Sequence, residues 1–362
     1  MRLGPMRRGR ILVTGYPPFA GGTRNISQIL IERLVNLGFE RIAIPTGPRV
    51  NDDGTPSHKK EEMEVEWNTQ LLSCDEAGSR WTAERVNSLE YDAILHLGLC
   101  NICEQPRLES VARNILDMRI EDNSGRCLQG ENVILGGLDQ IRSTAPLNRL
   151  PIEELCMILE DSDDAGSFVC NETYYRTLAA IEKNAVQDSF GRPLPCLFLH
   201  LPDAYGEEIE KQLALVKQLS AWLLTRPRIT VACSVLEDTD GSLISCRRSA
   251  DQSFAGAWEF PGGKVERGES LQEAFIRELD EELEVVIEPL APLAQHVHVM
   301  PNLEIELHAW HCRITDGIPR LSVHDAMRKL QVDELLNVEW IDADLPMIAE
   351  IQKALRNSEN AA

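Results

Sequence analysis

Residues 263–285 of this chain read GKVERGESLQEAFIRELDEELEV, and this stretch predicts the fold and chemistry of the last third of the sequence. Within it, Glu278, Glu281 and Glu282 stand at i, i+3 and i+4, so a helix would carry all three carboxylates on one face. Like charges placed so close together repel each other. A hard divalent cation such as Mg²⁺ binds carboxylate oxygens and would offset that repulsion. The stretch therefore predicts a helix with a metal site.

A Gly-rich loop, WEFPGGK at residues 258–264, precedes the acidic helix. Glycines allow the backbone to approach a ligand closely. Ser270 with Glu273 fits a capping box at the helix start, and Arg277 is placed to orient the glutamates by paired hydrogen bonds. A cation here would neutralise a pyrophosphate group and activate a water for attack on phosphorus. A solvated acidic helix is the competing interpretation, but it explains neither the loop nor its fixed distance from the glutamates.

The composition predicts a globular chain with two domains. Of 362 residues, 43% are apolar and 26% charged, which is enough for a sizeable core. The net charge of −22 argues against binding to polymeric nucleic acid. No apolar run reaches the roughly 18 residues of a membrane span, and the basic start lacks a signal-peptide core. We therefore expect a cytoplasmic protein without membrane contact, whose ten scattered cysteines are reduced thiols.

Between Arg10 and about Leu224, short apolar runs alternate with amphipathic helical patterns. The expected strands are 10–15, 91–98 and 195–201, the expected helices are 26–37, 169–184 and 207–224, and turn residues predict a loop at 47–58. This alternation predicts an α/β domain, with an open and mostly parallel sheet and helices on both faces. In such sheets the chemistry lies at the carboxyl ends of the strands.

The pattern changes after Thr225-Arg226-Pro227-Arg228, so we assign residues 10–225 and 229–358 to two domains. The second domain is expected to contain a hairpin of strands 229–236 and 242–247, a helix 270–283, strands 303–313 and 338–341, and a helix 346–356. These elements predict an α+β fold.

The loop and acidic helix together resemble the Nudix box, G-x5-E-x7-REU-x-EE-x-G-U. Eight of its nine defined positions match, and Glu284 replaces the late glycine. The matching residues are Gly263, Glu269, Arg277, Glu278, Leu279, Glu281, Glu282 and Val285. With the preceding residues, the segment is similar to the MutT-type branch, which releases pyrophosphate from nucleoside triphosphates such as 8-oxo-dGTP. The resemblance implies a Nudix fold in which Mg²⁺, or alternatively Mn²⁺, is held by Gly263, Glu278, Glu281 and Glu282, with Glu278 and Glu281 catalytic.

The same resemblance implies which residues meet the nucleotide. Asp344 is the candidate reader of the base, with a helix N-cap as the alternative. Phe260 would either stack on the base or pack in the core, and Arg247 would either meet a phosphate or be an ordinary strand-end arginine. The branch often carries a further metal-binding glutamate where this chain has Val323-His324. His324 would be either a replacement ligand or a surface residue, and we expect it to lie on the surface.

Four short blocks in the first domain contain a candidate catalytic triad. They are TGYPPF at 14–19, LESVARN at 108–114, AGSFVCN at 165–171 and FLHLP at 198–202. A cysteine that opens a helix has a depressed pKa, a histidine at a strand end can serve as its base, and a carboxylate can orient that histidine. Taken alone, Cys170 is more often a small buried apolar residue.

Together the blocks resemble pyroglutamyl peptidase I, a cysteine peptidase family of α/β fold that removes an N-terminal pyroglutamate from peptides. The resemblance implies Cys170 as nucleophile, His200 as general base and Glu109 as the orienting acid. Arg119 would stabilise charge near the oxyanion. The pocket for the pyrrolidone ring would be formed by Tyr16, Phe19 and Asn25.

One segment departs from that family. A Gly-rich loop is expected after the strand that ends near Gly98, but this chain has LCNICE at 99–104. The lone Cys100-x-x-Cys103 pair is a weak indication of zinc, and we expect two ordinary thiols.

These patterns predict a two-domain hydrolase that acts on a nucleoside triphosphate and on N-terminal pyroglutamyl peptides, with a homo-oligomer suggested by the peptidase resemblance. Two alternatives stay open. In one, only the Nudix domain is catalytic and the peptidase-like domain is a binding or regulatory module. In the other, the Nudix domain senses nucleotides and acts on the peptidase.

Overall fold

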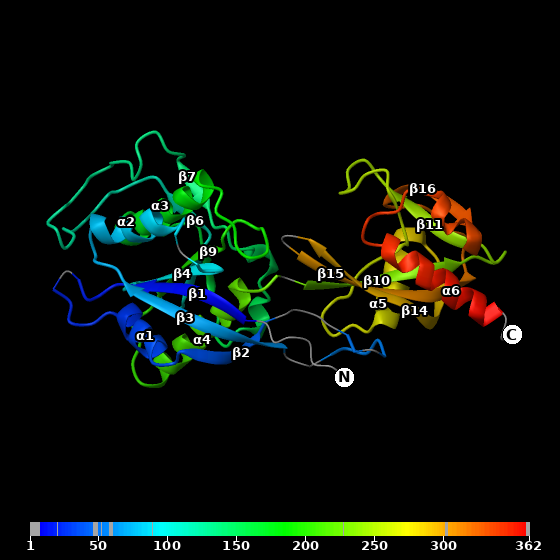
Figure 1. Cartoon of the computed structure of the whole chain (residues 1–362), viewed down its shortest axis with the longest axis horizontal. Helices are drawn as coiled ribbons and strands as arrows, with labels where there is room; N and C mark the ends of the chain where they lie inside the picture. Colours follow the sequence, from blue (N-terminus) through cyan, green and yellow to red (C-terminus); the bar gives the residue numbers. More distant parts are fainter. Residues whose placement is uncertain are drawn as a thin grey trace. The chain divides into compact units, whose positions relative to one another are not determined.

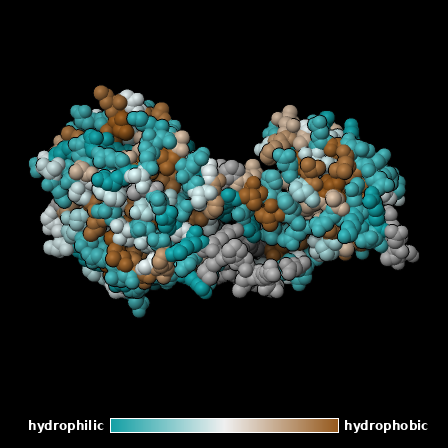
Figure 2. All heavy atoms as spheres, in the orientation of Figure 1, coloured by the Kyte–Doolittle hydropathy of each residue, from teal (hydrophilic) through white to brown (hydrophobic). Residues whose placement is uncertain are grey.

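The computed structural model describes residues 8–19, 21–45, 50–51, 53–57, 61–88, 90–226, 228–300 and 303–359 (Figure 1). The chain divides into two compact units, the first formed by Met1–Thr46 and Lys60–Pro227 and the second by Gly47–Lys59 and Arg228–Ala362. Hydrophilic residues predominate on the visible face of each unit (Figure 2). In the described part of the chain, no helix has the length and apolar character needed to span a membrane.

The first unit is built on a seven-stranded sheet of order β2-β3-β1-β4-β9-β5-β8. Its strands are β1 (Arg8–Gly15), β2 (Phe39–Ile44), β3 (Glu61–Leu71), β4 (Ala93–Leu99), β5 (Arg107–Glu109), β8 (Glu160–Ser162) and β9 (Cys196–Leu201). The β2–β3 and β5–β9 pairs are antiparallel, and the other four neighbouring pairs are parallel. The predicted mostly parallel sheet is confirmed.

Helices cover both faces of this sheet, as predicted (Figure 1). Side chains alternate along β1, so Ile11 and Val13 enter one core and Leu12 enters the other. Helices α1 and α4 pack into the core of Ile11, whereas α3 packs into the core of Leu12, and α2 contacts α3. The helices are α1 (Ile26–Val35), α2 (Glu76–Arg85), α3 (Val169–Lys183) and α4 (Glu207–Leu223). The remaining elements are the two-stranded ribbon β6 (Val111–Arg113) and β7 (Gln140–Arg142), and the 3-10 helices Leu147–Arg149 and Ile152–Glu154.

The second unit has a mixed seven-stranded sheet with the path β12-β11-β10-β15-β14, to which β13 adds on β10 and β16 adds on β11. The strands are β10 (Arg228–Glu237), β11 (Leu243–Arg248), β12 (Trp258–Glu259), β13 (Gly262–Lys264), β14 (Val286–Met300), β15 (Leu303–Asp316) and β16 (His324–Leu330). Helix α5 (Leu271–Leu283) packs with Ala232 of β10 on one face, and α6 (Ile348–Glu359) packs with Cys233 on the other. The predicted α+β fold is confirmed.

Several parts of this unit differ from the predicted elements. Strands β12, β13 and β16 were not predicted, and two further differences involve residues 338–341 and strand β14. Residues 338–341 form no strand, because Trp340 makes only an isolated bridge to Trp258, and 3-10 helices flank it at Val332–Asn337 and Leu345–Met347. Strand β14 was not predicted, since prolines usually exclude a strand interior. The structure accommodates Pro289 and Pro292 at shifts in the pairing register with β15.

The predicted loop at 47–58 lies partly outside the described residues, and its described part belongs to the second unit. Val50 forms a bridge with Pro56 and packs against the core that contains α5. The carbonyl of Gly54 accepts a hydrogen bond of 2.8 Å from the N–H of Leu271, at the start of α5. The first N–H groups of a helix lack partners inside the helix, so this contact satisfies one of them. The second unit is therefore assembled from two separate parts of the sequence.

Candidate active sites

Helix α5 begins at the predicted capping box. The Ser270 hydroxyl accepts a hydrogen bond from the Glu273 N–H, and the Glu273 carboxylate accepts one from the Ser270 N–H. The helix ends at Glu284, whose φ of 56° lies in the left-handed region. Glycine is favoured in that conformation, which explains why the Nudix pattern has a glycine at this position.

Arg277 ties the Gly-rich loop to the acidic helix. Its Nε donates to Glu269 Oε1 at 2.8 Å and its Nη1 donates to Glu278 Oε1 at 2.8 Å. Its Nη2 donates to the carbonyl of Lys264 at 2.9 Å, and Glu281 Oε2 lies 3.6 Å from Nη1. The hydrogen bonds from the guanidinium hold the pKa of Glu269 below its usual range. One side chain thus fixes the position of two carboxylates and one loop carbonyl.

Both glycines of the loop lie so close to neighbouring atoms that a side chain at either position would clash. A Cβ atom on Gly263 would lie 2.3 Å from the carboxylate of Glu278. Gly262 has a φ of 141°, and a Cβ there would lie 2.1 Å from the carbonyl oxygen of Ala232. The Gly262 N–H donates to Glu282 Oε2 at 3.0 Å. Strand β13 therefore brings its backbone directly against the carboxylates of α5.

A cavity of about 610 Å³ lies beside these contacts, and its wall includes both acidic and basic side chains. Its charged lining residues are Arg228, Arg248, Glu259, Lys264, Glu266, Glu278 and Glu282. Burial raises the pKa of Glu282 to about 7; His324 opposes that rise, and the nearby Glu259 and Glu278 add to it. Glu281 does not line the cavity, and its side chain is 61% exposed. Within the described ranges, no three His, Cys, Asp or Glu side chains are grouped to hold a metal ion.

The expected surface position of His324 is wrong. Its side chain is 1% exposed, and its Nε2 lies 2.9 Å from Glu259 Oε1. Glu259 is also ion-paired with Arg248, so two partners fix its carboxylate in the cavity wall. Glu259 and Arg248 were not among the predicted site residues. The available signal was the position of Glu259 within the Gly-rich loop, three residues before Gly262.

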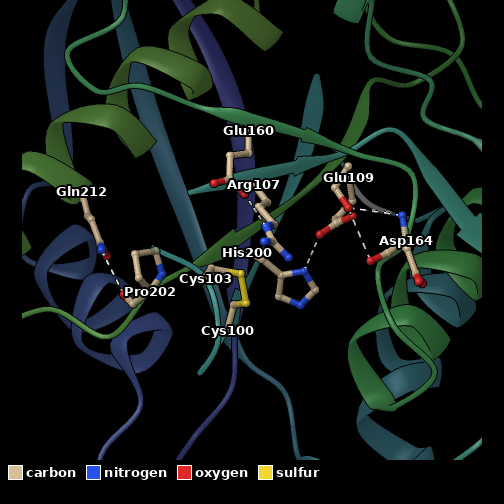
Figure 3. The surroundings of a disulfide bond; sticks show 10 residues. Cys100, Cys103, Arg107, Glu109, Glu160, Asp164, His200, Pro202 and Gln212 are labelled. Atoms are coloured by element: carbon tan, nitrogen blue, oxygen red, sulfur yellow. Dashed lines mark hydrogen bonds and ion pairs between the residues drawn. A yellow bond between two sulfur atoms is a disulfide. The ribbon is translucent and has the colours of Figure 1, made fainter. Parts of the chain in front are cut away.

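In the first unit, strand alternation places the candidate histidine on the same face as α3. Cys196 and Phe198 of β9 enter the core that contains α3, so His200, two residues further, lies on that face. Its Nδ1 lies 2.7 Å from Glu109 Oε1 (Figure 3). Glu109 ends the neighbouring strand β5, and its carbonyl accepts a hydrogen bond from the Tyr174 hydroxyl at 2.9 Å. The structure thus joins Glu109 to His200.

Cys170 is the second residue of α3, and its partly exposed side chain packs against the same core. Burial raises the pKa of its thiol, and the nearby Cys74 and Glu109 raise it further. This direction is opposite to the depression expected from a helix N-terminus. In the part of the chain that the structure describes, no hydrogen bond joins Cys170 to His200. Both observations favour the neutral thiol over the thiolate in this arrangement.

Comparison with known proteins assigns the two units. The family model of the NUDIX domain matches residues 226–358, and the model of pyroglutamyl peptidase matches residues 75–221. The CTP pyrophosphohydrolase of Escherichia coli K12 is 35% identical over 133 residues, which cover 37% of this chain and 97% of that protein. This chain belongs to the Nudix family.

Two further relatives support this division of the chain. The 8-oxo-dGTP diphosphatase of Escherichia coli K12 is 29% identical over 92 residues, 25% of this chain and 71% of that protein. The pyrrolidone-carboxylate peptidase of Fusobacterium nucleatum is 28% identical over 196 residues, 53% of this chain and 78% of that protein. The chain combines a Nudix domain with a pyroglutamyl-peptidase-like domain, and both are hydrolase domains.

The structure places the expected nucleotide-binding residues of the Nudix domain away from the cavity wall. Phe260 is buried with its ring 4.4 Å from that of Trp340, so it packs in the core. Asp344 is buried and accepts a hydrogen bond from the Phe260 N–H at 3.0 Å, and it makes no side-chain cap to the following 3-10 helix. Arg247 pairs with Asp325 at 2.6 Å, whereas its neighbour Arg248 lines the cavity.

The expected pocket residues of the peptidase-like domain are divided in the structure. Tyr16 is buried and donates to the Thr173 hydroxyl at 2.7 Å. The ring of Phe19 lies 6.0 Å from that of Phe168, which is two residues before Cys170 in the sequence. Asn25 acts as the N-cap of α1, since its side chain accepts from the N–H of residue 27 at 3.0 Å. Arg119 is exposed and makes no hydrogen bond or ion pair with the residues that are described.

The expectation of two ordinary thiols at residues 100 and 103 is wrong. Cys100 and Cys103 form a disulfide with a Cα–Cα distance of 5.5 Å, which is in the usual range. The other eight cysteines are free. In the disulfide form this pair offers no thiolate ligand to zinc.

Proposed function

We propose that the Nudix domain hydrolyses a nucleoside triphosphate to its monophosphate and pyrophosphate. The observation that carries this proposal is the carboxylate of Glu278, held between Arg277 and Gly263 in the wall of a cavity that also presents basic side chains. The similarity to a CTP pyrophosphohydrolase and to an 8-oxo-dGTP diphosphatase supports this substrate class.

The donor chemistry of the cavity fits a hard divalent cation. Carboxylate oxygens of Glu278 and Glu282 meet the backbone of Gly262 and Gly263 there, and mutual repulsion helps to raise the pKa of Glu282. We infer that Glu278 and Glu282 would hold Mg²⁺ or Mn²⁺ with the Gly263 carbonyl, and that Glu281 would join from the exposed side. The cation would activate a water and neutralise the phosphate charge.

The basic side chains of the cavity have a complementary role. Arg248 and Lys264 line the same cavity as Glu278 and Glu282 and can receive the phosphate oxygens that are not bound by the cation. Glu259, fixed by Arg248 and His324, keeps the Arg248 guanidinium in place. These residues bind and orient a triphosphate while Arg277 holds the catalytic glutamate.

Substitutions in the full chain test this assignment against a matched control. Glu278→Gln and Glu281→Gln should abolish Mg²⁺-dependent turnover of CTP and 8-oxo-dGTP, and Mn²⁺ affinity measured by paramagnetic resonance should fall. Asp280→Asn changes an exposed carboxylate on the same helix and should leave both readouts unchanged. Full turnover by Glu281→Gln would remove Glu281 from the metal site.

For the peptidase-like domain, we propose cleavage of N-terminal pyroglutamate through Cys170. The pairing of Glu109 with Nδ1 of His200 leaves Nε2 as the nitrogen that takes the thiol proton. The thiolate would then attack the pyroglutamyl carbonyl, the carbonyl C–N bond would break, and the leaving amine would take the proton from His200. Water would afterwards cleave the thioester, releasing pyroglutamic acid and the Cys170 thiol. Cys170→Ala should eliminate cleavage of a pyroglutamyl amide, and unchanged cleavage would contradict the nucleophile.

A binding or regulatory role is the second candidate for this domain, and the raised pKa of Cys170 favours it. Thiol alkylation against pH separates the two roles. A catalytic Cys170 should become reactive below the pH of an ordinary thiol once a pyroglutamyl ligand is bound. A residue that stays unreactive in the presence of ligand would support the binding role.

A further inference from the structure

The Cys100–Cys103 disulfide closes a turn at the carboxyl end of β4, next to His200. The N–H of Cys100 donates to the carbonyl of Leu201 at 2.8 Å, and the β4–β9 register places Gly98 opposite His200. Figure 3 shows the disulfide beside the imidazole ring, with Glu109 on the ring's other side. The turn and the candidate general base are therefore direct neighbours.

Packing leaves little space between this end of β4 and the imidazole. A Cβ atom on Gly98 would lie 2.9 Å from Cδ2 of His200 and 2.7 Å from Cε1 of Phe198. On the opposite side, β5 places Arg107 next to His200. A displacement of the turn that begins at Cys100 must therefore be transmitted to the ring, because close-packed side chains cannot absorb it.

The two sulfur-bearing residues differ in accessibility. Cys100 is partly exposed, whereas Cys103 is buried. The two residues between them are exposed, and the side chain of Ile102 is 85% exposed. Cys100 is therefore the residue of the pair that an external thiolate would approach, with the sulfur of Cys103 as the leaving group.

We propose that Cys100 and Cys103 form a thiol–disulfide exchange site whose redox state sets the surroundings of His200. A thiolate of an external dithiol attacks Sγ of Cys100, the S–S bond breaks, and the electron pair leaves on Sγ of Cys103, which takes a proton. The second thiolate of the dithiol then attacks the dithiol sulfur that is bonded to Cys100 in the mixed disulfide. The Cys100 sulfur leaves and takes a proton. The dithiol becomes a disulfide, and the pair gains two electrons and two protons.

The consequence for activity rests on the proposed peptidase function. The disulfide form has the His200–Glu109 pair in place, so this form keeps the imidazole oriented by its carboxylate. Reduction opens the turn and removes the covalent constraint next to the ring. The rate of pyroglutamyl amide cleavage should fall roughly tenfold, because small displacements of a catalytic group are costly.

The test uses the full chain in buffers with graded ratios of reduced to oxidised dithiothreitol. Samples are acid-quenched and alkylated with N-ethylmaleimide, and the mass of the peptide containing residues 100–103 reports the redox state. NMR follows the ring Cε1–H signal of His200 in the same buffers. This signal is identified as the one that is missing from the spectrum of the His200→Gln variant. We expect one reversible two-electron transition, a shift of the His200 signal with it, and a parallel change in the peptidase rate.

Two variants complete the design. Cys100→Ser/Cys103→Ser should lose the transition and keep the His200 signal at its reduced position. Cys127→Ser/Cys156→Ser removes two exposed free cysteines and should leave the transition intact. A pair that never changes state, or a His200 signal that stays fixed through the transition, would overturn the inference. If neither state cleaves the amide, the peptidase proposal fails, and the transition and the His200 signal alone decide the exchange site.

Discussion

Gly263 and Glu278 approach each other so closely that a Cβ atom on residue 263 would lie 2.3 Å from the glutamate carboxylate. Arg277 holds the same carboxylate from another direction, through a hydrogen bond of 2.8 Å. The loop and the helix therefore fix one carboxylate between them. This arrangement explains the constant spacing between the Gly-rich loop and the acidic helix, which a solvated helix would not require.

Gly263→Ala should displace the Glu278 carboxylate, because the added methyl group occupies its position. We expect nucleotide turnover to fall by about 100-fold and the free energy of unfolding to fall by about 1–3 kcal/mol. Turnover and urea denaturation measure the two effects. Gly241→Asn is the control, since nothing lies within 4 Å of a Cβ there and asparagine tolerates its φ of 80°. Normal turnover by Gly263→Ala would contradict the close contact.

Glu284→Gly should stabilise the Nudix domain. Glu284 ends α5 with a φ of 56°, and glycine adopts this conformation without strain. Its ion pair with Arg320, at 3.5 Å, is exposed and contributes little. We expect a gain of about 0.5–1 kcal/mol in urea denaturation. The control Glu288→Gly, on β14, should instead lower the free energy of unfolding. If Glu284→Gly lowers it as well, Glu284 is not strained.

Glu109→Gln should impair the peptidase while preserving the fold. The amide N–H₂ would donate to Nδ1 of His200 and select the wrong tautomer, leaving a proton on the nitrogen that must accept one. We expect pyroglutamyl amide cleavage to fall by about 10²–10⁴-fold, with nucleotide turnover unchanged. Glu160→Gln, on the neighbouring β8, changes a partly exposed partner of Arg107 and should have little effect. Equal rates for Glu109→Gln and wild type would remove Glu109 from the site.

His96 should make the stability of the chain depend on pH below neutrality. It is fully buried in β4, where burial lowers its pKa from 6.5 to about 3. Between these values the unfolded chain binds a proton that the folded chain does not, so stability falls as the pH falls below 6.5. We expect a loss of about 1 kcal/mol between pH 6.5 and 5.5.

The variant His96→Phe isolates this contribution, because it keeps a ring beside Tyr174 and Phe198 and removes the titrating group. Urea denaturation at several pH values should show a shallower pH dependence for the variant than for wild type. Identical slopes for the two proteins would mean that His96 is already charged in the folded state.

Elements with strong periodicity were predictable from the sequence. Short apolar runs predicted β1, β4 and β9, and amphipathic helical patterns predicted α1, α3, α4 and α5, all close to their observed bounds. Strand β14 was not predictable in this way, because Pro289 and Pro292 are tolerated only through register shifts with β15. The segment around Gly54 was equally hidden, since its partner Leu271 lies more than 200 residues further along the chain.

Contacts between site residues that are close in the sequence were also predictable. Contacts that depend on how distant strands pair were not. The links from Arg277 to Glu269 and Glu278 follow from helix and loop spacing. The contact of His324 with Glu259 depends on strand positions 65 residues apart, so His324 looked like a surface residue. The disulfide at Cys100 depends on a turn geometry that the sequence pattern does not specify.

The identity of the products tests the central claim most directly. The full chain should be incubated with Mg²⁺ and either CTP or 8-oxo-dGTP, and the products followed by ³¹P NMR. The account predicts one pyrophosphate for each nucleoside monophosphate, and no product from Glu278→Gln. Release of orthophosphate with a nucleoside diphosphate, or the same products at an undiminished rate from Glu278→Gln, would contradict it.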